Sequence, residues 1–195
     1  MSNTKKLDLI IWGATGFTGQ LVSQYISKTY SSTDLEWRIA GRNKEKIFSI
    51  ANKLNINDDR IFIADSNNIE SLVKLASKTK VICTTVGPYA KYGTNLVEAC
   101  IRSGTHYCDI TGETQWIRKM IDKYHLKAKE NKVKIINSCG FDSIPSDMGV
   151  FYSQKKLFEK TGKYASKINM RVAGAKGGIR EVHIIAFQMF WKKPV

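Results

Sequence analysis

Three glycines near the amino-terminal end, Gly13, Gly16 and Gly19, are spaced three residues apart between an apolar segment and a helix-like segment. Glycine has no Cβ atom, so the chain can turn sharply at these positions. The turn can then bring backbone N–H groups at a helix N-terminus close to an anion. The spacing G-x-x-G-x-x-G is a variant of G-x-G-x-x-G, and it keeps glycine at the turn and at the contact between helix and strand. We therefore predict a loop that binds a dinucleotide pyrophosphate, formed by Gly13, Thr15, Gly16, Phe17, Thr18 and Gly19.

The end of the second predicted strand bears on which dinucleotide is bound. An NAD-binding domain places an acid about 20 residues after the glycines, where it binds the ribose, whereas this chain has Gly41, Arg42 and Asn43 there. A guanidinium can pair a 2′-phosphate through two hydrogen bonds, so Arg42 favours NADP, with NAD as the alternative. A solvated or capping Arg42 is the plainer interpretation. Asp65, at the end of the third predicted strand, is placed either to reach the adenine amino group or to cap a helix.

The segment after the fourth predicted strand is the candidate reaction zone. In an open parallel sheet, ligands bind beyond the carboxyl ends of the strands at the switch point, so Val86, Gly87 and Pro88 should line the nicotinamide side. Tyr89 is a candidate proton donor or stacking surface, although core packing is the commoner role of such a tyrosine. Asp142 is the second candidate for proton transfer, and capping of the helix that follows it would explain it equally well.

A competing catalytic pattern lies further along the chain. Tyr152 and Lys156 form Y-x-x-x-K, and Ser138 ends a predicted strand fourteen residues before the tyrosine. The three resemble the Ser, Tyr and Lys of short-chain dehydrogenases, in which the tyrosine exchanges a proton with a carbonyl. However, a loop intervenes between the strand and the helix, and the strand is the sixth of the chain rather than the fifth. One-turn Tyr/Lys pairs also arise by chance in a lysine-rich chain, so this is the weaker hypothesis.

Patterns of buried strands and amphipathic helices alternate regularly through about the first 140 residues. This alternation predicts an α/β fold, a Rossmann-like doubly wound parallel sheet of about six strands with helices on both faces. The first helix should bury Leu21, Val22, Tyr25 and Ile26. Predicted strands cover residues 10–12, 37–40, 61–64, 81–86, 106–110 and 133–137, and predicted helices lie near 47–54, 69–76, 96–101, 116–129 and 145–158.

The regular alternation of strand and helix patterns ends after the predicted sheet, which indicates a domain boundary. We assign residues 7–150 to an NAD(P)-binding domain and residues 151–195 to the start of a truncated, divergent second domain. A strand is expected over 168–173. The apolar run 184–191 is followed by lysines, a composition compatible with an interfacial segment, although packing on a further domain is the plainer interpretation.

The 195-residue chain carries a formal charge of +14 and has a pI near 9.6, which indicates an anionic partner without specifying the fold. Its lysines are scattered, as on solvated helix faces. Cys83, Cys100, Cys108 and Cys139 form neither a C-x-x-C pair nor a metal-ligand spacing, so we expect buried, reduced thiols and no metal. No run approaches the length of a membrane span, and the polar start leaves no room for a signal peptide, so a cytoplasmic protein is expected.

Four segments together resemble the saccharopine dehydrogenase-like oxidoreductases, over about residues 8–153. They read GATGFTGQLV (13–22), AGRNKEKI (40–47), VGPYAKYGTNLVEACIRSGTHYCDITGE (86–113) and CGFDSIPSDMGV (139–150). In that family the first segment is the nucleotide loop, AGR ends the second strand, and the last two segments surround the active-site cleft. Close relatives include trans-acting enoyl reductases of glycolipid synthesis, and members are associated with lipid droplets and membranes. The resemblance implies an NADP-linked reductase acting on a lipid-like or acyl small molecule.

Family members are considerably longer, and their second domain supplies much of the substrate site and of the subunit interface. We therefore predict retained cofactor binding, with a homo-oligomer as a further hypothesis, and we leave catalysis by this chain open. The alternative is a non-catalytic nucleotide-binding module that contacts a lipid droplet or membrane surface through its basic charge. Nucleic-acid binding ranks last, because no recognised module accompanies the charge.

Overall fold

The computed structural model describes residues 7–30 and 35–169. The chain forms two compact units, Met1–Gly140 and Phe141–Val195. The predicted fold lies in the first of them. The domain boundary predicted at residue 150 stays a prediction.

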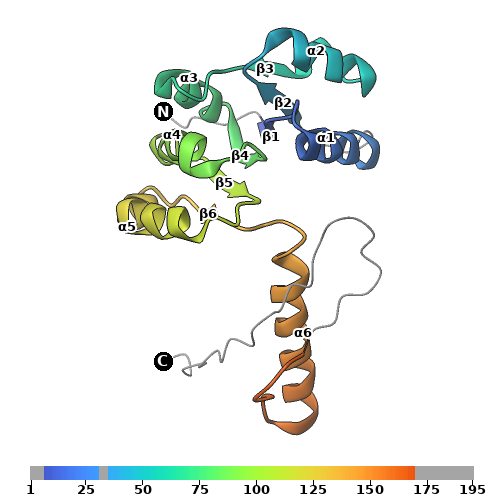
Figure 1. The fold of residues 1–195 in the computed structure, drawn as a ribbon, viewed down its shortest axis with the longest axis vertical. Coiled ribbons are helices and arrows are strands. Elements are labelled where there is room, and N and C mark those ends of the chain that lie inside the picture. Colours follow the sequence, from blue (N-terminus) through green and yellow to red (C-terminus); the bar gives the residue numbers. More distant parts are fainter. Residues whose placement is uncertain (1–6, 31–34, 170–195) are drawn as a thin grey trace. The chain divides into compact units, whose positions relative to one another are not determined.

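A six-stranded parallel sheet forms the centre of the first unit, with the strand order β3-β2-β1-β4-β5-β6 (Figure 1). The chain builds the sheet outward from β1 to β3, then returns to place β4 on the other side of β1 and continues to β6. The direction of winding therefore reverses between β1 and β4, as in a doubly wound fold. This confirms the predicted α/β architecture. The strands are β1 Leu7–Trp12, β2 Trp37–Gly41, β3 Ile61–Ile63, β4 Thr79–Thr84, β5 His106–Asp109 and β6 Ile135–Ile136.

Helices pack on both faces of the sheet and bury two apolar clusters. The cluster around Ile82 and Tyr107 includes residues of α3, α4 and α5, whereas the cluster around Ile11 and Ile39 includes residues of α1 and α2. Successive side chains of a strand point to opposite faces, so one strand supplies both clusters. The helices of this unit are α1 Phe17–Thr29, α2 Lys44–Lys53, α3 Ile69–Ala76, α4 Tyr89–Arg102 and α5 Thr114–Glu130, with a short 3₁₀ helix, η1 Asp58–Arg60.

The buried face of α1 differs from the prediction. Leu21 and Tyr25 are 52% and 59% exposed, and the helix buries Gly19 and Ser23 instead. Small residues let the helix backbone approach the glycine loop closely, so the apolar side chains to either side are turned outward. The other two predicted contact residues pack against the core as expected, namely Val22 and Ile26.

Several element boundaries also differ from the prediction, and two of the differences have a clear physical reason. β4 begins two residues earlier than predicted, because Thr79 and Lys80 belong to the strand without contributing an apolar signal. α4 begins at Tyr89 rather than near Leu96, and its first turn carries little apolar periodicity. Its N-terminus is stabilised from elsewhere in the chain, by Glu113.

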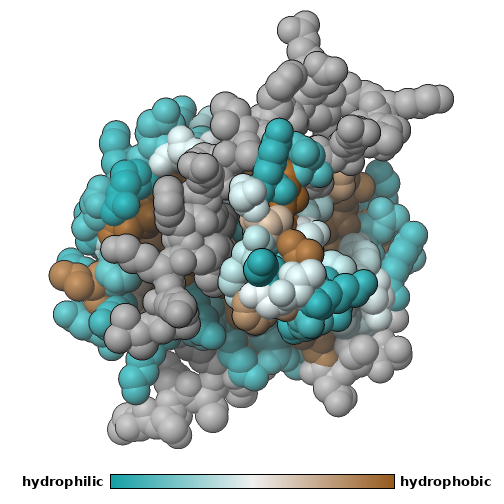
Figure 2. Space-filling view, turned by 90° about the horizontal axis from the view of Figure 1, so that it is seen from below, coloured by the Kyte–Doolittle hydropathy of each residue, from teal (hydrophilic) through white to brown (hydrophobic). Residues whose placement is uncertain are grey.

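The second unit contains α6, Ile144–Thr161, which confirms the helix predicted over 145–158. Pro145 lies in its first turn, where a backbone N–H has no partner within the helix. Beyond the helix, Tyr164 stacks on Phe158 with ring centroids 4.7 Å apart. Several apolar side chains of α6 remain exposed, and Figure 2 shows hydrophobic residues that reach the surface among hydrophilic ones.

Two predicted features fall at the end of the chain. The strand predicted over 168–173 lies largely outside the described residues, and the apolar run 184–191 lies outside them entirely. Within the described ranges, no helix is both long enough and apolar enough to cross a membrane.

Candidate nucleotide-binding site

A hollow of about 230 Å³ opens at the carboxyl ends of β1, β2 and β4, where the direction of winding reverses. This is the place at which doubly wound sheets bind their ligands. Six of the residues predicted from sequence line it: Gly13, Thr15, Gly16, Arg42, Val86 and Gly87. The other residues that line the hollow were not predicted: Trp12, Gly41, Ser66, Thr85 and Tyr92.

Two of the glycines cannot carry a side chain. Gly13 has φ +90°, and a Cβ there would lie under 3.0 Å from the Val86 side chain. A Cβ on Gly19 would meet the backbone of the loop, 2.8 Å from the carbonyl carbon of Gly13 and 2.9 Å from the Cα of Ala14. The first glycine therefore makes the turn and the third lets α1 touch the loop, as the sequence predicts.

The N-terminus of α1 is suited to an anion. Its N-cap, Gly16, has no side chain that could accept a hydrogen bond from the helix, and the first turn contains no acidic residue. The loop is held by hydrogen bonds to its own carbonyls, because Gly16 N donates to the Gly13 carbonyl at 3.0 Å and the Gln20 side chain donates through Nε2 to the Thr15 carbonyl at 3.1 Å. Helix N–H groups without a protein cap, at the positive end of the helix dipole, fit a pyrophosphate. Phe17 is 82% exposed at this end and does not line the hollow.

Arg42 lies on the wall of the hollow, directly after β2. The next residue, Asn43, begins α2 by accepting a hydrogen bond from Lys46 N at 2.8 Å, so it is Asn43 that caps this helix. None of the ion pairs found among the described residues involves Arg42. The guanidinium therefore meets the requirements for binding a phosphate group at this edge.

The end of β3 contributes a serine to the hollow where the sequence suggested an acid. The Asp65 carboxylate accepts the backbone N–H of Asn67 at 2.9 Å, which holds the turn toward α3. Asp65 is not among the residues that line the hollow, and Ser66 is. The Ser66 carbonyl accepts a hydrogen bond from Asn95 Nδ2 at 3.2 Å, which ties this turn to α4. Contact between Asp65 and adenine stays a prediction.

The segment after β4 forms the opposite wall. Thr85 N donates to the Trp12 carbonyl at 3.1 Å, so β4 remains paired with β1 beyond its last assigned residue. Val86 N then donates to Thr84 Oγ1 at 3.2 Å, which turns the chain away from the sheet. The peptide bond between Gly87 and Pro88 is cis, and Pro88 is the N-cap of α4. Pro88 itself does not line the hollow.

Tyr89 is buried rather than directed into the hollow. Only 5% of the residue is exposed, and its ring packs against Trp116 with centroids 5.6 Å apart. The hydroxyl donates to the Thr84 carbonyl at 3.2 Å and accepts the Ile110 N–H at 3.4 Å. Burial is the main cause of a pKa raised well above the usual value of tyrosine. These contacts suit a residue that fixes the end of β4, and its role in proton transfer stays a prediction.

Two acids that sequence reasoning missed organise the same end of the sheet. Glu113 accepts the backbone N–H groups of Tyr89 and Ala90 at 2.6 and 2.8 Å and so caps α4 from 24 residues away. Asp109 is 1% exposed and accepts hydrogen bonds from two side chains and two backbone amides. No local pattern marks either acid, because the partners are brought together only by the fold. The four donors to Asp109 are Tyr107 Oη, Asn137 Nδ2, Thr111 N and Ser138 N.

Asp142 and the Tyr/Lys pair belong to the second unit. The N-cap of α6 is Ser143, and Asp142 contributes only its carbonyl, which accepts the Ser146 hydroxyl at 2.9 Å. Lys156 pairs with Glu159, on the same helix, at 2.9 Å. In the first unit, Ser138 donates its hydroxyl to the Thr111 carbonyl at 2.8 Å. The participation of Asp142 in proton transfer stays a prediction.

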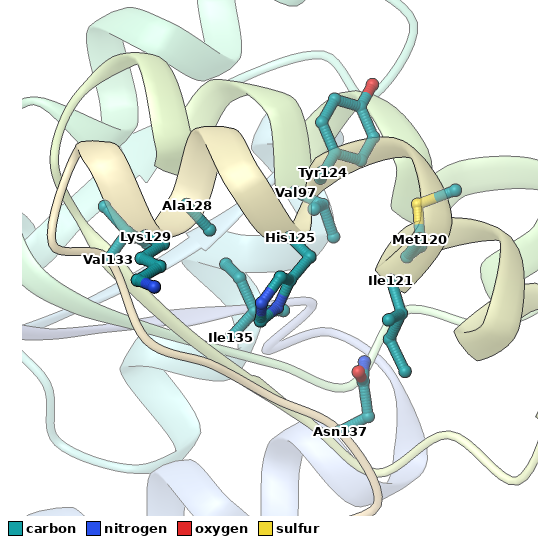
Figure 3. A pocket seen from close by; sticks show the side chains of 10 residues that line it. All are labelled: Val97, Met120, Ile121, Tyr124, His125, Ala128, Lys129, Val133, Ile135 and Asn137. Atoms are coloured by element: carbon teal, nitrogen blue, oxygen red, sulfur yellow. The ribbon is translucent and has the colours of Figure 1, made fainter.

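A second hollow in the first unit, of about 240 Å³, lies between α5 and β6 (Figure 3). Its walls are mainly apolar, and His125 and Lys129 lie one turn apart on α5 beside it. None of the predicted site residues lines it. The candidate cofactor site is therefore the hollow at the switch point.

The strand order, the glycine loop and the hollow at the switch point define a dinucleotide-binding α/β domain. Residues 9–136 match the model of a protein family described as the saccharopine dehydrogenase NADP binding domain. The chain belongs to this family, and its cofactor is NADP. The glycine cradle and the uncapped helix N-terminus fit a pyrophosphate, and the Arg42 guanidinium on the wall of the hollow fits a phosphate group.

Curated relatives extend the likeness beyond this domain. The chain is similar to a trans-acting enoyl reductase of Mycobacterium ulcerans, with 37% identity over 167 residues, which are 84% of this chain and 40% of the relative. A putative trans-acting enoyl reductase of Mycobacterium tuberculosis is 35% identical over 176 residues, 89% of this chain and 42% of the relative. The chain thus spans about two fifths of the length of these relatives.

Solved structures share the fold at lower identity. The saccharopine dehydrogenase (L-Glu forming) of Saccharomyces cerevisiae has a TM-score of 0.57 at 17% identity, over 78% of this chain and 31% of that one. The triphenylmethane reductase of Citrobacter sp., whose structure is a complex with NADP(H), has a TM-score of 0.51 at 19% identity, over 67% and 48% of the two chains.

Proposed function

We propose that this chain is the cofactor-binding part of an NADP(H)-dependent oxidoreductase that acts on an enoyl or other acyl, lipid-like substrate. The observation that carries the proposal is the hollow at the switch point, where the glycine loop, Arg42 and the segment after β4 meet. The substrate class rests on the 37% identity to a trans-acting enoyl reductase. A role in glycolipid metabolism belongs to the same proposal.

Different residues of the hollow bind different parts of NADP(H). The turn at Gly13 and the amides that begin α1 bind the pyrophosphate, and Arg42 binds the 2′-phosphate. The backbone at Val86 and Gly87 positions the nicotinamide side of the cleft. When bound, the nicotinamide supplies or accepts the hydride, and the protein supplies position and charge.

The test is a titration of the purified chain with NADPH and with NADH, followed by cofactor fluorescence, for the wild type and for Arg42→Ala. Hydrogen bonds between charged groups are worth about 1.5–3 kcal/mol, so loss of the guanidinium should weaken NADPH binding by roughly 10-fold to 150-fold. NADH lacks the 2′-phosphate, so its Kd should change little.

Lys53→Ala is the matched control. Lys53 lies in the last turn of α2, the helix that Arg42 precedes, and its removal lowers the net charge by the same amount. A helix of this length places the lysine about 15 Å from the hollow. Equal weakening of NADPH binding by the two variants would mean that Arg42 contributes only through its positive charge and does not contact the 2′-phosphate. A folded chain that binds neither cofactor would overturn the proposal itself.

The candidates for proton transfer need a separate test. Tyr89→Phe removes only the hydroxyl, which bonds to Thr84 and Ile110. If Tyr89 transfers a proton, the variant loses turnover of an enoyl thioester while its Kd for NADPH stays unchanged. Turnover at the wild-type rate would remove Tyr89 from the mechanism, and Asp142→Asn is tested in the same way.

A further inference from the structure

The four cysteines of the chain divide into two environments. Cys100 is buried in α4, as expected from the sequence, whereas Cys83, Cys108 and Cys139 are only partly buried. The expectation of buried thiols is therefore confirmed for Cys100, whereas the other three thiols are less buried than expected. Cys83 lies on β4 and Cys108 on the neighbouring β5, whereas Cys139 lies in the loop that follows β6.

Cys83 and Cys108 are directly opposite each other in the sheet. Strands β4 and β5 are parallel and in the register that pairs these two residues. Paired strands lie about 4.8 Å apart, which is inside the range of roughly 4.4–6.8 Å between Cα atoms that a disulfide requires. The spacing of paired strands is therefore compatible with a disulfide between these two residues.

The pair lies on a face of the sheet that the helices of the first unit leave open. The row of paired residues across the sheet runs Ile11, Cys83, Cys108 and Ile136. Ile11 is fully buried under α1 and α2, whereas Ile136 at the other end is 52% exposed. Tyr107 and its neighbours face the opposite side, where α3, α4 and α5 pack. Small reagents can thus reach the two thiols.

We propose that Cys83 and Cys108 form a dithiol site that a hydroperoxide converts into a disulfide between β4 and β5. The Cys83 thiolate attacks the terminal oxygen of the hydroperoxide, the O–O bond breaks, and the alkoxide takes up the released proton to leave as an alcohol. The Cys108 sulfur then attacks the sulfenic acid on Cys83 and displaces hydroxide, which leaves as water with the Cys108 proton. The two thiols together lose two electrons and the hydroperoxide gains two.

The direction of attack follows from the environment of each thiol. The neighbouring Cys108 thiol lowers the pKa of Cys83, and the same interaction, together with burial, raises the pKa of Cys108. The thiolate is the nucleophile in this chemistry, so Cys83 reacts first and Cys108 resolves. Burial raises the pKa of Cys139, which makes this third thiol the poorer competitor.

Peptide mapping of the whole chain tests the proposal, because trypsin separates all four cysteines. The chain is treated with tert-butyl hydroperoxide at equimolar amount and then blocked with N-ethylmaleimide in denaturant, so that the buried Cys100 also reacts. It is then digested without reduction. Peptides 81–91 and 103–118, which contain Cys83 and Cys108, should be found linked, with a mass two hydrogens below their sum. Peptides 92–102 and 135–155, which contain Cys100 and Cys139, should carry the maleimide.

Two variants separate the steps. Cys108→Ser removes the resolving thiol, so a sulfenic acid should accumulate on Cys83 and be trapped there by dimedone. Cys100→Ser is the matched control and should form the same linked peptides as the wild type. A disulfide that includes Cys139, maleimide on both Cys83 and Cys108 after peroxide treatment, or a dimedone adduct elsewhere in Cys108→Ser would overturn the proposal.

Discussion

Replacement of Gly19 by alanine tests the geometry of the cofactor loop most directly. The added Cβ would lie 2.8 Å from the Gly13 carbonyl carbon and 2.9 Å from the Ala14 Cα, and closer still to the Gly13 oxygen. Carbon atoms in ordinary contact are at least about 3.5 Å apart. The start of α1 must therefore retreat from the loop by at least about 0.6 Å, because the atoms it meets are backbone and cannot rotate aside.

The free energy of unfolding should fall despite a favourable change of residue type. Alanine in place of glycine favours a helix by about 1 kcal/mol, whereas forcing a methyl group into a packed site costs about 1–3 kcal/mol and occasionally more. We expect a net loss of up to about 2 kcal/mol, which is the difference between these effects. The same displacement separates the helix N–H groups from the turn at Gly13, so NADPH should bind at least tenfold more weakly.

Urea denaturation followed by tryptophan fluorescence measures the stability, since Trp12, Trp37 and Trp116 lie in the first unit. Gly149→Ala is the matched control, because Gly149 is also within a helix and a Cβ there meets nothing within 4 Å. That variant should gain helical content in α6 and keep the wild-type affinity for NADPH. If Gly19→Ala keeps both the urea midpoint and the NADPH affinity of the wild type, α1 does not pack on the loop as described.

Two further substitutions test the acids and the buried tyrosine at the carboxyl end of the sheet. Glu113→Gln should lower the free energy of unfolding by about 1–3 kcal/mol, because the capping carboxylate is replaced by an amide, part of which is a donor. The exposed Glu130→Gln should change it by less than about 0.5 kcal/mol in the same urea titration. Burial raises the pKa of Tyr107 in the folded chain, so its contribution to stability is complete below the unfolded pKa of about 10 and is lost above it. Between pH 10 and 11, the free energy of unfolding should therefore fall less steeply with pH in Tyr107→Phe than in the wild type. The two slopes should differ by up to about 1.4 kcal/mol per pH unit, and equal slopes in the two proteins would contradict this.

The sequence was sufficient for the order and type of the elements in the first unit. Parallel strands that are buried on both faces read as apolar runs, and the helices between them show helical periodicity, so both signals are local. Boundaries that depend on distant partners were harder to predict. The start of α4 at Tyr89 depends on Glu113, and the start of β4 at Thr79 depends on pairing with β1.

Some residues of the hollow could be predicted from the sequence because backbone conformation decides their residue type. Gly13 is required by its positive φ and by the approach of Val86, and such a requirement is visible as glycine in the sequence. Ser66 and Tyr92 enter the hollow because β3 and α4 end and begin beside it, which no local pattern records. Tyr89 was predicted to face the reaction zone and is buried instead, since the first turn of α4 packs it against Trp116.

The caps on α4 and on the end of β5 also set an order of assembly. A ribosome makes the chain from its amino-terminal end, so the glycine loop and α1 are complete before the opposite wall exists. α4 emerges before Glu113, which caps it, and Asp109 emerges before Asn137 and Ser138, which bind its carboxylate. The side of the cleft that contains the glycine loop can thus form early in synthesis, whereas the wall after β4 reaches its final form only when the chain through residue 138 has emerged.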